Sequence, residues 1–209
     1  MCCGDASLTV SRETRAAQYF PERQREALSY AETLATTAIE RGLIGPKEGE
    51  RIWDRHIENC IPITMLLPQE KATVADIGSG AGLPGIVIAL AHPGLKVTLV
   101  EPLQRRVEFL CEVIDSLKLT NVEVIRAKSE SIKGAYDYVV ARAVAPLPRL
   151  METTWHLVKP GGSLLAMKGA SVEGEIAGLS LPKGAQLSLK EINLEEMPSA
   201  RVVQITKAG

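Results

Sequence analysis

The sequence predicts an α/β protein in which helices cover both faces of a mostly parallel sheet and a helical extension precedes the sheet. From Thr73 onward, short apolar runs rich in β-branched residues alternate with helical patterns, which is typical of a parallel sheet covered on both faces. Before Thr73, apolar residues recur at helical spacing instead. A chain of 209 residues suits one core domain with an appendage, so we expect an extension over residues 1–70 and a core domain over residues 71–209.

Two helices are expected in the extension. Pro21 suits the first turn of a helix and Gly42 suits its end, and the apolar residues between them recur with a helical period. A second helix follows Pro46, and its apolar face consists of Ile52, Trp53, Ile57 and Cys60. We expect Trp53 to pack the extension onto the sheet rather than to stack on a base. Residues 1–18 are polar and mixed, and we expect a frayed end there.

Seven apolar runs of the core domain are expected to form strands. They cover residues 73–78, 95–100, 122–125, 136–141, 163–167, 185–194 and 200–206. Helical patterns over residues 84–91, 103–117 and 146–158 separate several of these runs. The last two runs are joined by a polar turn, so we expect an antiparallel hairpin there. The helix over residues 103–117 is expected to bury Val107, Leu110, Cys111, Ile114 and Leu117.

Composition excludes several function classes. The chain has 24 Lys and Arg against 25 Asp and Glu, a net charge of −1, so binding of nucleic acid must depend on a local basic patch. Its four cysteines, Cys2, Cys3, Cys60 and Cys111, contain no CxxC pair, and its three histidines are far apart, so we expect neither a metal site nor a disulfide framework. Cys60 and Cys111 are expected in the core. We expect no signal peptide and no membrane span, and hence a cytoplasmic protein.

The strongest local signal is VADIGSGAGLPG at residues 74–85, which follows an expected strand and opens an expected helix. Glycines 78, 80 and 82 allow a tight turn and close approach to a ligand. Glu101 ends the second strand, where an acid can accept hydrogen bonds from both ribose hydroxyls of an adenosine. Residues 80–85 also match the dinucleotide pattern G-x-G-x-x-G, but the Asp76 carboxylate would repel a pyrophosphate and attract an ammonium and a sulfonium. The loop therefore favours S-adenosylmethionine over NAD.

Six segments carry a resemblance to a known family: IWDRHIENC, DIGSGAGLPGI, EPLQRRVEFL, AKSES, ARAVAPL and LLAMKG. From about residue 20 to its end, the chain resembles the bacterial small-subunit (16S) ribosomal RNA guanine-N7 methyltransferases, also called glucose-inhibited division protein B. These are class I, Rossmann-like S-adenosylmethionine-dependent methyltransferases. The resemblance implies a seven-stranded sheet, S-adenosyl-L-methionine as cofactor, and ribosomal RNA or the small ribosomal subunit as substrate. We expect a monomer with no membrane partner.

The resemblance also implies site residues. The cofactor is expected to contact Asp76, Gly78, Gly80, Gly82, Leu83, Glu101, Ser129, Glu130 and Arg142. The substrate is expected to contact Arg55, His56, Lys128 and Lys168. Lys128 stands where the family more often has arginine, so it keeps the charge but loses the bidentate geometry. For His56, a partly buried structural role is an equally good interpretation.

Arg142 and Lys168 are the expected catalytic residues. They follow the fourth and fifth expected strands, and ligands of open α/β sheets bind at the carboxyl ends of strands. There they could hold guanine O6 and the flanking phosphates. The alternative is that each only ends its strand and points to solvent.

The segment after the fourth expected strand narrows the chemistry. Methylation of exocyclic amines commonly uses an [N/D]-P-P-[Y/F/W] segment at this place, but residues 141–147 read ARAVAPL. Methylation of a pyrimidine carbon needs a cysteine nucleophile near this strand, and no cysteine follows Cys111. What remains is an atom with a free lone pair, such as guanine N7, whose methylation requires alignment but no general base.

Three alternative functions stay open at this point. A methyltransferase for a small molecule would have a deep, apolar, closed pocket above the cofactor, whereas an RNA methyltransferase would have an open shelf lined by Arg and Lys. A non-catalytic S-adenosylmethionine-binding adaptor is the second alternative, although Asp76 and Glu101 are both present. An NAD-linked oxidoreductase is the third.

Overall fold

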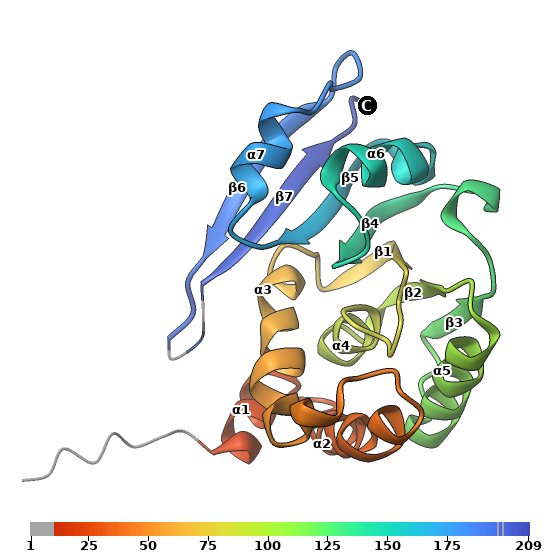
Figure 1. The fold of residues 1–209 in the computed structure, drawn as a ribbon, viewed down its shortest axis with the longest axis vertical. Coiled ribbons are helices and arrows are strands. Elements are labelled where there is room, and N and C mark those ends of the chain that lie inside the picture. Colours follow the sequence, from red (N-terminus) through yellow and green to blue (C-terminus); the bar gives the residue numbers. More distant parts are fainter. Residues whose placement is uncertain (1–10, 196, 198) are drawn as a thin grey trace, which may run out of the picture.

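A seven-stranded sheet in the order β3-β2-β1-β4-β5-β7-β6 forms the centre of the computed structural model (Figure 1). The structure describes residues 11–195, 197 and 199–209. The strands are β1 Glu70–Ile77, β2 Gly94–Val100, β3 Val122–Ile125, β4 Tyr136–Arg142, β5 Val158–Lys168, β6 Gln186–Ile192 and β7 Ala200–Thr206. The first five are parallel, whereas β6 and β7 form an antiparallel hairpin next to β5. The expected fold class and its closing hairpin are confirmed.

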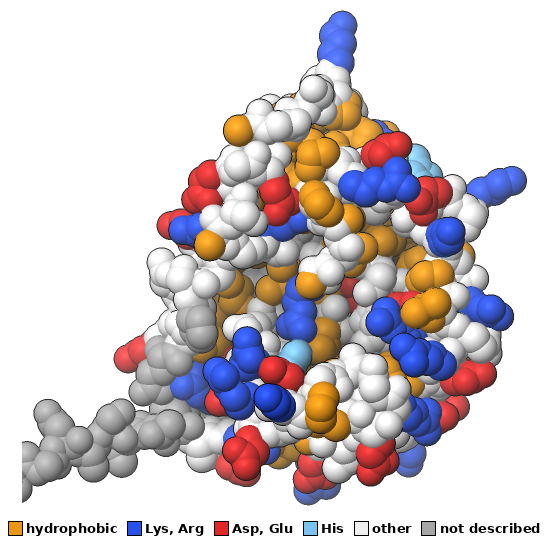
Figure 2. All heavy atoms as spheres, viewed as in Figure 1, with side chains coloured by type: hydrophobic (Ala, Val, Ile, Leu, Met, Phe, Trp, Pro, Cys, Tyr) orange, Lys and Arg blue, Asp and Glu red, His pale blue; other side chains and the backbone are white. Residues whose placement is uncertain are grey.

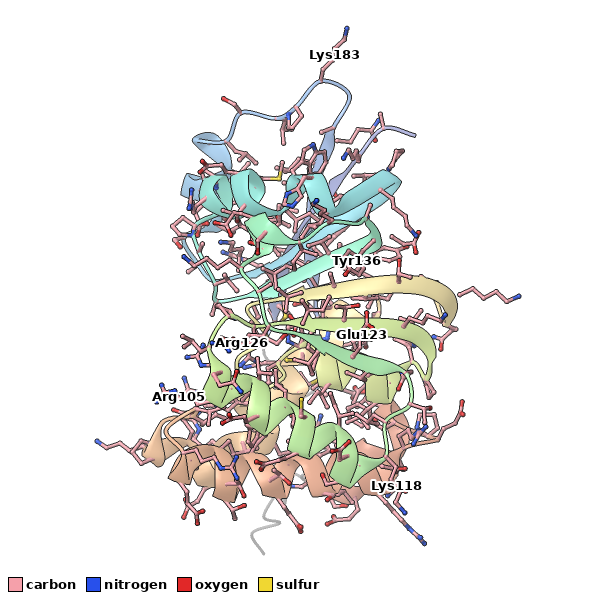
Figure 3. The ribbon with its side chains drawn as sticks, turned by 90° about the vertical axis from the view of Figure 1, so that its right-hand side faces the viewer. Arg105, Lys118, Glu123, Arg126, Tyr136 and Lys183 are labelled. Atoms are coloured by element: carbon pink, nitrogen blue, oxygen red, sulfur yellow. The ribbon has the colours of Figure 1, made fainter. Side chains whose placement is uncertain are left out.

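Helices cover both faces of this sheet. On one face lie α4 Gly85–Ala91 and α5 Gln104–Leu117, and on the other lie α6 Leu147–Thr154 and α7 Val172–Ala177, together with 3-10 turns at Ser129–Ser131 and Trp155–Leu157. The extension is made of α1 Arg12–Tyr19, α2 Gln24–Thr33, a π turn at Leu34–Ala38, a 3-10 helix at Pro46–Arg51, a π turn at Trp53–Ile57, a 3-10 turn at Glu58–Cys60 and α3 Ile61–Thr64. It packs on the face that carries α4 and α5, as the side view shows (Figure 3).

Neighbouring residues of β1 point into two different cores. Val74 is buried with α4, α5 and the extension, whereas Ala75 and Ile77 are buried with α6 on the opposite face. This alternation is the period of two that every strand imposes. It places the side chain of Asp76 on the same face as Val74, under the start of α4. The alternation along β1 thus decides that Asp76 is covered by α4 and not by α6.

The extension shares its apolar core with α4 and α5. Phe20 and Trp53 are buried and meet edge to face, with ring centroids 6.4 Å apart. The Trp53 Nε1–H group donates a 2.8 Å hydrogen bond to Glu58, whose carboxylate pairs with Arg15 at 3.2 Å. A buried indole needs such a partner for its N–H group. Trp53 therefore packs within the extension, against Phe20 and Glu58, in the core cluster that the extension shares with α4 and α5; its packing onto the sheet stays a prediction. The boundary between extension and core domain at residue 70 stays a prediction.

One expectation about the extension is wrong. Residues 12–19 of the supposedly frayed end form α1, because the Ser11 hydroxyl accepts a hydrogen bond from the Thr14 amide and caps the helix. The helix expected between Pro21 and Gly42 is present over residues 24–40, with a π turn at Leu34–Ala38 inside it. Residues 1–10, with Cys2 and Cys3, lie outside the described residues. Among the helices that the structure describes, none is both long and apolar enough to cross a membrane.

The buried stripe of α5 is also rotated from its expected position. Phe109, Leu110, Val113 and Leu117 are buried, whereas Cys111 is exposed and Ile114 only half-buried. The expectation placed Cys111 in the core and omitted Phe109. Because Phe109 is the larger apolar side chain, its burial removes more apolar area from water and rotates the stripe by one position.

The stripe on α5 makes a testable prediction. Phe109→Ala should lower the free energy of unfolding by about 3–5 kcal/mol because it opens a cavity in the core. Cys111→Ala, two positions away on the same helix, should change it by less than about 0.5 kcal/mol. Urea denaturation of both variants measures the difference. Similar losses in the two variants would contradict the observed orientation of α5.

Candidate functional site

Two cavities open at the carboxyl ends of the parallel strands. β1 pairs with β2 on one side and with β4 on the other, so the strand order changes direction between β1 and β4. Ligands of open α/β sheets bind at such a switch point. The first cavity, of about 290 Å³, is lined by Ile77, Gly78, Val100, Pro102, residues 127–130, Val144, Ala145, Arg149 and Thr153. We call it the β1–β3 cavity.

The second cavity, of about 690 Å³, lies on the other side of the loop that follows β4. It is lined by Arg55, Asn59, residues 142–146, residues 167–169, Glu175 and residues 199–201. We call it the β4–β5 cavity. Val144 and Ala145 line both cavities, so a ligand in one would come close to a ligand in the other. Figure 2 shows this face of the molecule hollowed, with lysine and arginine side chains in and around the hollow.

Asp76 is the most unusual group at this edge of the sheet. Its side chain is fully buried, and one carboxylate oxygen, Oδ2, accepts a 3.0 Å hydrogen bond from the Gly85 amide. A Cβ atom at position 85 would come within 2.6 Å of this oxygen, so only glycine allows the contact. The other oxygen, Oδ1, has no hydrogen-bond partner among the described residues. Burial raises the pKa of Asp76 from 3.8 to about 7.

The unpaired Asp76 oxygen points to a ligand. A buried acceptor without a partner is costly, and native structures nearly always satisfy it. A cationic donor such as an ammonium group would supply the missing hydrogen bond and keep the carboxylate ionised. The chemistry of this acceptor fits the charged end of an S-adenosylmethionine, but Asp76 lines neither cavity, so the contact itself stays a prediction.

Glu101 holds the glycine loop. Its carboxylate is 1% exposed and accepts hydrogen bonds from the Gly80 amide through Oε2 and from the Leu103 amide through Oε1, both at 3.0 Å. Arg106 lies 3.5 Å from the same carboxylate. Glu101 thus joins the end of β2 to the loop after β1. It does not line the β1–β3 cavity, so its contact with a ribose stays a prediction.

The remaining expected cofactor residues divide into four groups. Gly78, Ser129 and Glu130 line the β1–β3 cavity, and their contact with the adenine and ribose stays a prediction. Gly80 and Gly82 form the turn of the loop with positive φ angles of 60° and 98°. Leu83 is buried in the core and lines neither cavity. Arg142 lines the β4–β5 cavity instead of the β1–β3 cavity, as described next.

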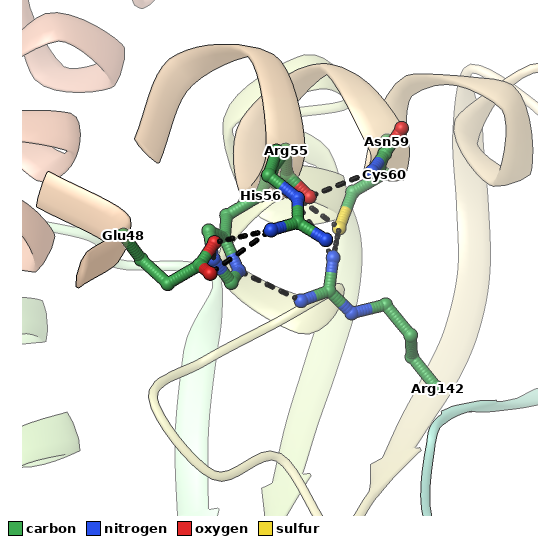
Figure 4. A network of polar contacts seen from close by, with 6 residues as sticks. All are labelled: Glu48, Arg55, His56, Asn59, Cys60 and Arg142. Carbon is green, nitrogen blue, oxygen red and sulfur yellow. Dashed lines mark hydrogen bonds and ion pairs between the residues drawn. The ribbon is translucent and has the colours of Figure 1, made fainter. Parts of the chain in front are cut away.

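Arg142 extends from the end of β4 into contact with the helical extension (Figure 4). Its Nη1 group donates to the His56 carbonyl oxygen and to Cys60 Sγ, both at 3.3 Å, and its Nη2 group lies 3.1 Å from His56 Nδ1. On its other side, His56 Nε2 lies 3.2 Å from Glu48 Oε2. Burial lowers the pKa of His56, and the nearby Arg142 charge lowers it further. The Arg142 guanidinium is therefore fixed by hydrogen bonds to the extension and does not point freely to solvent.

The Lys168 ammonium is also fixed by hydrogen bonds. Its ammonium donates to the Ala145 carbonyl oxygen at 2.7 Å and to Glu175 Oε2 at 2.8 Å, and only 10% of its side chain is exposed. Glu175 also accepts a 2.6 Å hydrogen bond from the Leu147 amide. Both contacts fasten the loop that separates the two cavities. The ion pair with Lys168 lowers the pKa of Glu175.

The other residues expected to contact substrate do not all meet. Arg55 lines the β4–β5 cavity with Asn59, and its guanidinium donates to Glu48 at 3.0 Å. Lys128 instead lies in the lining of the β1–β3 cavity beside Ser129 and Glu130. Its role toward RNA stays a prediction. No cluster of three or more metal-ligating side chains exists among the described residues.

Sequence reasoning missed four residues at this site. Glu48 and Glu175 carry no motif, and only their partners in space distinguish them from surface acids. Tyr30, fully buried, donates a 2.8 Å hydrogen bond to the Ala81 carbonyl oxygen of the glycine loop from 51 positions away. Gly85 had a signal, because it ends the G-L-P-G run, but its contact with Asp76 needed the structure.

Comparison with known proteins agrees with this geometry. The family model described as GidB, rRNA small subunit methyltransferase G, matches residues 23–201. A "Ribosomal RNA small subunit methyltransferase G" of Nocardioides sp. is 50% identical over 175 residues, which are 80% of this chain and 70% of the relative. The protein of the same name from Streptomyces coelicolor is 44% identical over 185 residues, covering 87% of this chain and 74% of the relative.

Solved structures support the fold alone. A ribosomal protein L11 methylase from Lactobacillus delbrueckii subsp. bulgaricus superposes with a TM-score of 0.57 at 15% identity, covering 74% of this chain and 80% of that one. A methyltransferase described as putative, yhhF from Escherichia coli, superposes with a TM-score of 0.54 at 18% identity, covering 75% and 88%.

The pKa of Asp76 makes a signed prediction. Its folded-state pKa lies above its unfolded value of 3.8, so between these values the folded protein binds more protons than the unfolded chain. The free energy of unfolding of the ligand-free protein should therefore decline by an amount on the order of a few kcal/mol as pH rises from about 4 to about 7. Asp76→Asn keeps an oxygen for the Gly85 amide and removes the titration. Thermal unfolding across this range should be flatter in Asp76→Asn; equal slopes would show that Asp76 does not titrate there.

Proposed function

The chain belongs to the rRNA small subunit methyltransferase G family, and on this premise we propose that it transfers a methyl group from S-adenosylmethionine to N7 of a guanine in small-subunit (16S) ribosomal RNA. The observation that carries the proposal is the β4–β5 cavity. Three arginines and one lysine line it, namely Arg55, Arg142, Arg201 and Lys168, and it adjoins the β1–β3 cavity at Val144 and Ala145. A basic cavity beside a cofactor cavity suits a phosphate-bearing base.

The cofactor would lie against the glycine loop. Asp76 Oδ1 is free to accept from an ammonium group, and the lining of the β1–β3 cavity offers apolar Val100 and Pro102 together with Ser129 and Glu130 for an adenine ring. When bound, S-adenosylmethionine supplies an electrophilic methyl group on a sulfonium. The chain's own contribution is to hold the glycine loop through Glu101 and to keep the two cavities next to each other.

The reaction requires alignment rather than proton transfer. The lone pair of guanine N7 forms the new N–CH₃ bond while the S–CH₃ bond breaks, and N7 carries no proton that a base would have to remove. Arg142 and Arg55 are placed to donate hydrogen bonds to guanine O6 or to phosphate oxygens in the β4–β5 cavity. Positioned donors of this kind lower the barrier by fixing the geometry of attack. His56 has no role as a general base in this mechanism.

The lining of the β4–β5 cavity also decides among the alternatives. A small-molecule methyltransferase would need an apolar, closed pocket, whereas this cavity has charged side chains on several elements. A non-catalytic adaptor would not need a second cavity next to the cofactor. NAD is disfavoured because the buried Asp76 carboxylate would face a pyrophosphate. We further propose that the protein acts as a monomer in the cytoplasm, on ribosomal RNA or on the small ribosomal subunit.

The position of the methyl group tests the function. Labelled S-adenosylmethionine is offered to the protein with small subunits, large subunits and free small-subunit RNA, and the label should enter only small-subunit RNA. Treatment of the modified RNA with borohydride and aniline should cleave it at one labelled guanosine, because N7 methylation labilises that base. Label that resists cleavage, or that lies on an exocyclic amine or a ribose, would contradict the N7 assignment.

The role of Lys168 makes a second prediction. Lys168→Met removes the ammonium and releases the Ala145 carbonyl group, so turnover should fall on the order of tenfold or more because the loop between the cavities loses its position. Binding of S-adenosylhomocysteine, measured by calorimetry, should change less than turnover. Glu175→Gln is the matched variant, since it keeps an acceptor for the Leu147 amide but loses the charge.

The matched pair separates two roles of Lys168. If Lys168 acts only through its ion pair with Glu175, both variants should reduce turnover alike. If it also contacts RNA, Glu175→Gln should retain much more activity than Lys168→Met. Full activity in Lys168→Met would remove Lys168 from the site.

A further inference from the structure

Arg142 belongs to the sheet, but the extension holds its guanidinium. The hydrogen bonds of Arg142 to His56 and Cys60 span 86 and 82 positions of the chain. Three of the five N–H groups of a guanidinium are used in this way, which leaves two for a ligand in the β4–β5 cavity that Arg142 lines. The direction of these two free N–H groups is thus fixed by residues of the extension.

The geometry defines the tautomer of His56. A guanidinium can only donate, so His56 Nδ1 must present its lone pair to Arg142 Nη2. The proton of the neutral imidazole is then on Nε2, where it faces the Glu48 carboxylate at 3.2 Å. Arg55 donates to both Glu48 oxygens, at 3.0 and 3.3 Å, and so fixes that carboxylate. The network runs from Glu48 through His56 to Arg142 (Figure 4).

Protonation of His56 would break this arrangement. A proton on Nδ1 would place two donors and two positive charges against each other over the 3.1 Å contact with Arg142. The charged groups that face the imidazole are Glu48 from the 3-10 helix, Arg55 from its own turn and Arg142 from β4. Burial, Arg142 and Arg55 lower the pKa of His56, while Glu48 opposes them. Near neutral pH, His56 is therefore the neutral acceptor that Arg142 requires.

Cys60 completes the enclosure of Arg142 without adding a charge. Burial raises the pKa of its thiol to about 11, so the thiol stays protonated. It donates to the His56 carbonyl oxygen at 3.1 Å and accepts from Arg142. Among the described hydrogen-bond partners of Arg142, His56 is consequently the one whose charge can change near neutral pH, and the buried Asp76, on which the Arg142 charge acts, would be held ionised by bound cofactor.

We propose that His56 is a positioning residue, whose neutral imidazole, in the tautomer set by Glu48, directs Arg142 into the β4–β5 cavity and releases it when protonated. This inference rests on the proposed function, since it assigns the orientation of Arg142 a role in aligning the substrate base. It makes the helical extension part of the substrate site. It also gives His56 a role that is distinct from a general base and from passive packing.

Two isosteric substitutions separate this role from a structural one. In His56→Asn, the amide oxygen can take the place of Nδ1 and accept from Arg142, without a titratable group. In His56→Gln, the amide nitrogen can take the place of Nε2 and donate to Glu48, but the acceptor for Arg142 is lost. We expect His56→Asn to keep kcat within a few-fold and His56→Gln to lose it on the order of a hundredfold, with cofactor affinity unchanged in both.

The pH profile supplies the second readout. With saturating RNA and cofactor, the wild-type rate should fall on the acid side as His56 becomes protonated, and His56→Asn should lack this fall. Glu48→Gln removes the group that raises the His56 pKa, so the acid limb should move to lower pH. His156→Gln, a change at an exposed histidine in the turn before β5, is the control and should leave rate and profile unchanged. Equal losses in His56→Asn and His56→Gln, or an acid limb that persists in His56→Asn, would overturn the proposal.

A measurement without RNA keeps the inference separate from the proposed function. Long-range ¹H–¹⁵N spectra of the wild-type protein report which imidazole nitrogen carries the proton, and His56 should carry it on Nε2 at neutral pH. A proton on Nδ1, or a doubly protonated ring at neutral pH, would overturn the proposal even if methylation of guanine N7 is verified. Conversely, a failure to methylate RNA in the wild type would contradict the proposed function and leave the predicted tautomer to be decided by the spectra.

Discussion

The turn between β1 and α4 depends on three buried side chains that satisfy its backbone. Tyr30 of the extension donates to the Ala81 carbonyl group, Glu101 at the end of β2 accepts from the Gly80 amide, and Asp76 accepts from the Gly85 amide. A tight glycine-rich turn exposes peptide groups that cannot pair with each other, and buried peptide groups need partners. The loop is therefore rigid only when the extension, the sheet and α4 are all in place.

Most charged groups around the two cavities have a partner, and this makes the exception informative. Lys168 is paired with Glu175, and Glu101 lies near Arg106 while it accepts two amides. The buried Asp76 is different, because one of its oxygens has no partner among the described residues. Asp76 therefore still offers a buried acceptor, and its pairing with a cationic ligand belongs to the proposed function.

Much of the fold was predictable, and the errors have physical causes. The strands were recognised because β-branched runs between turns identify buried parallel strands whatever they pack against. The stripe of α5 was missed because it depends on contacts outside its own segment, whereas the local Ser11 cap of α1 was overlooked although tertiary contacts stabilise that helix further. Phe109 reaches the core only in one rotation of α5, and α1 is stabilised by packing of Phe20 and by the Arg15–Glu58 pair. α7 was not predicted, since its six residues carry little periodicity.

By itself, the sequence determined the cofactor loop. Asp76, the three glycines and Glu101 lie at fixed spacing at the ends of two strands. Such a local pattern can be recognised in the sequence without knowledge of the tertiary contacts. Only the tertiary structure decided how the proposed substrate side is built. Glu48, His56 and Arg142 carry no common motif, and nearly a hundred positions separate the first from the last. They meet because the extension packs on the face of the sheet that presents the end of β4, and a contact of that range exists only once both parts have folded.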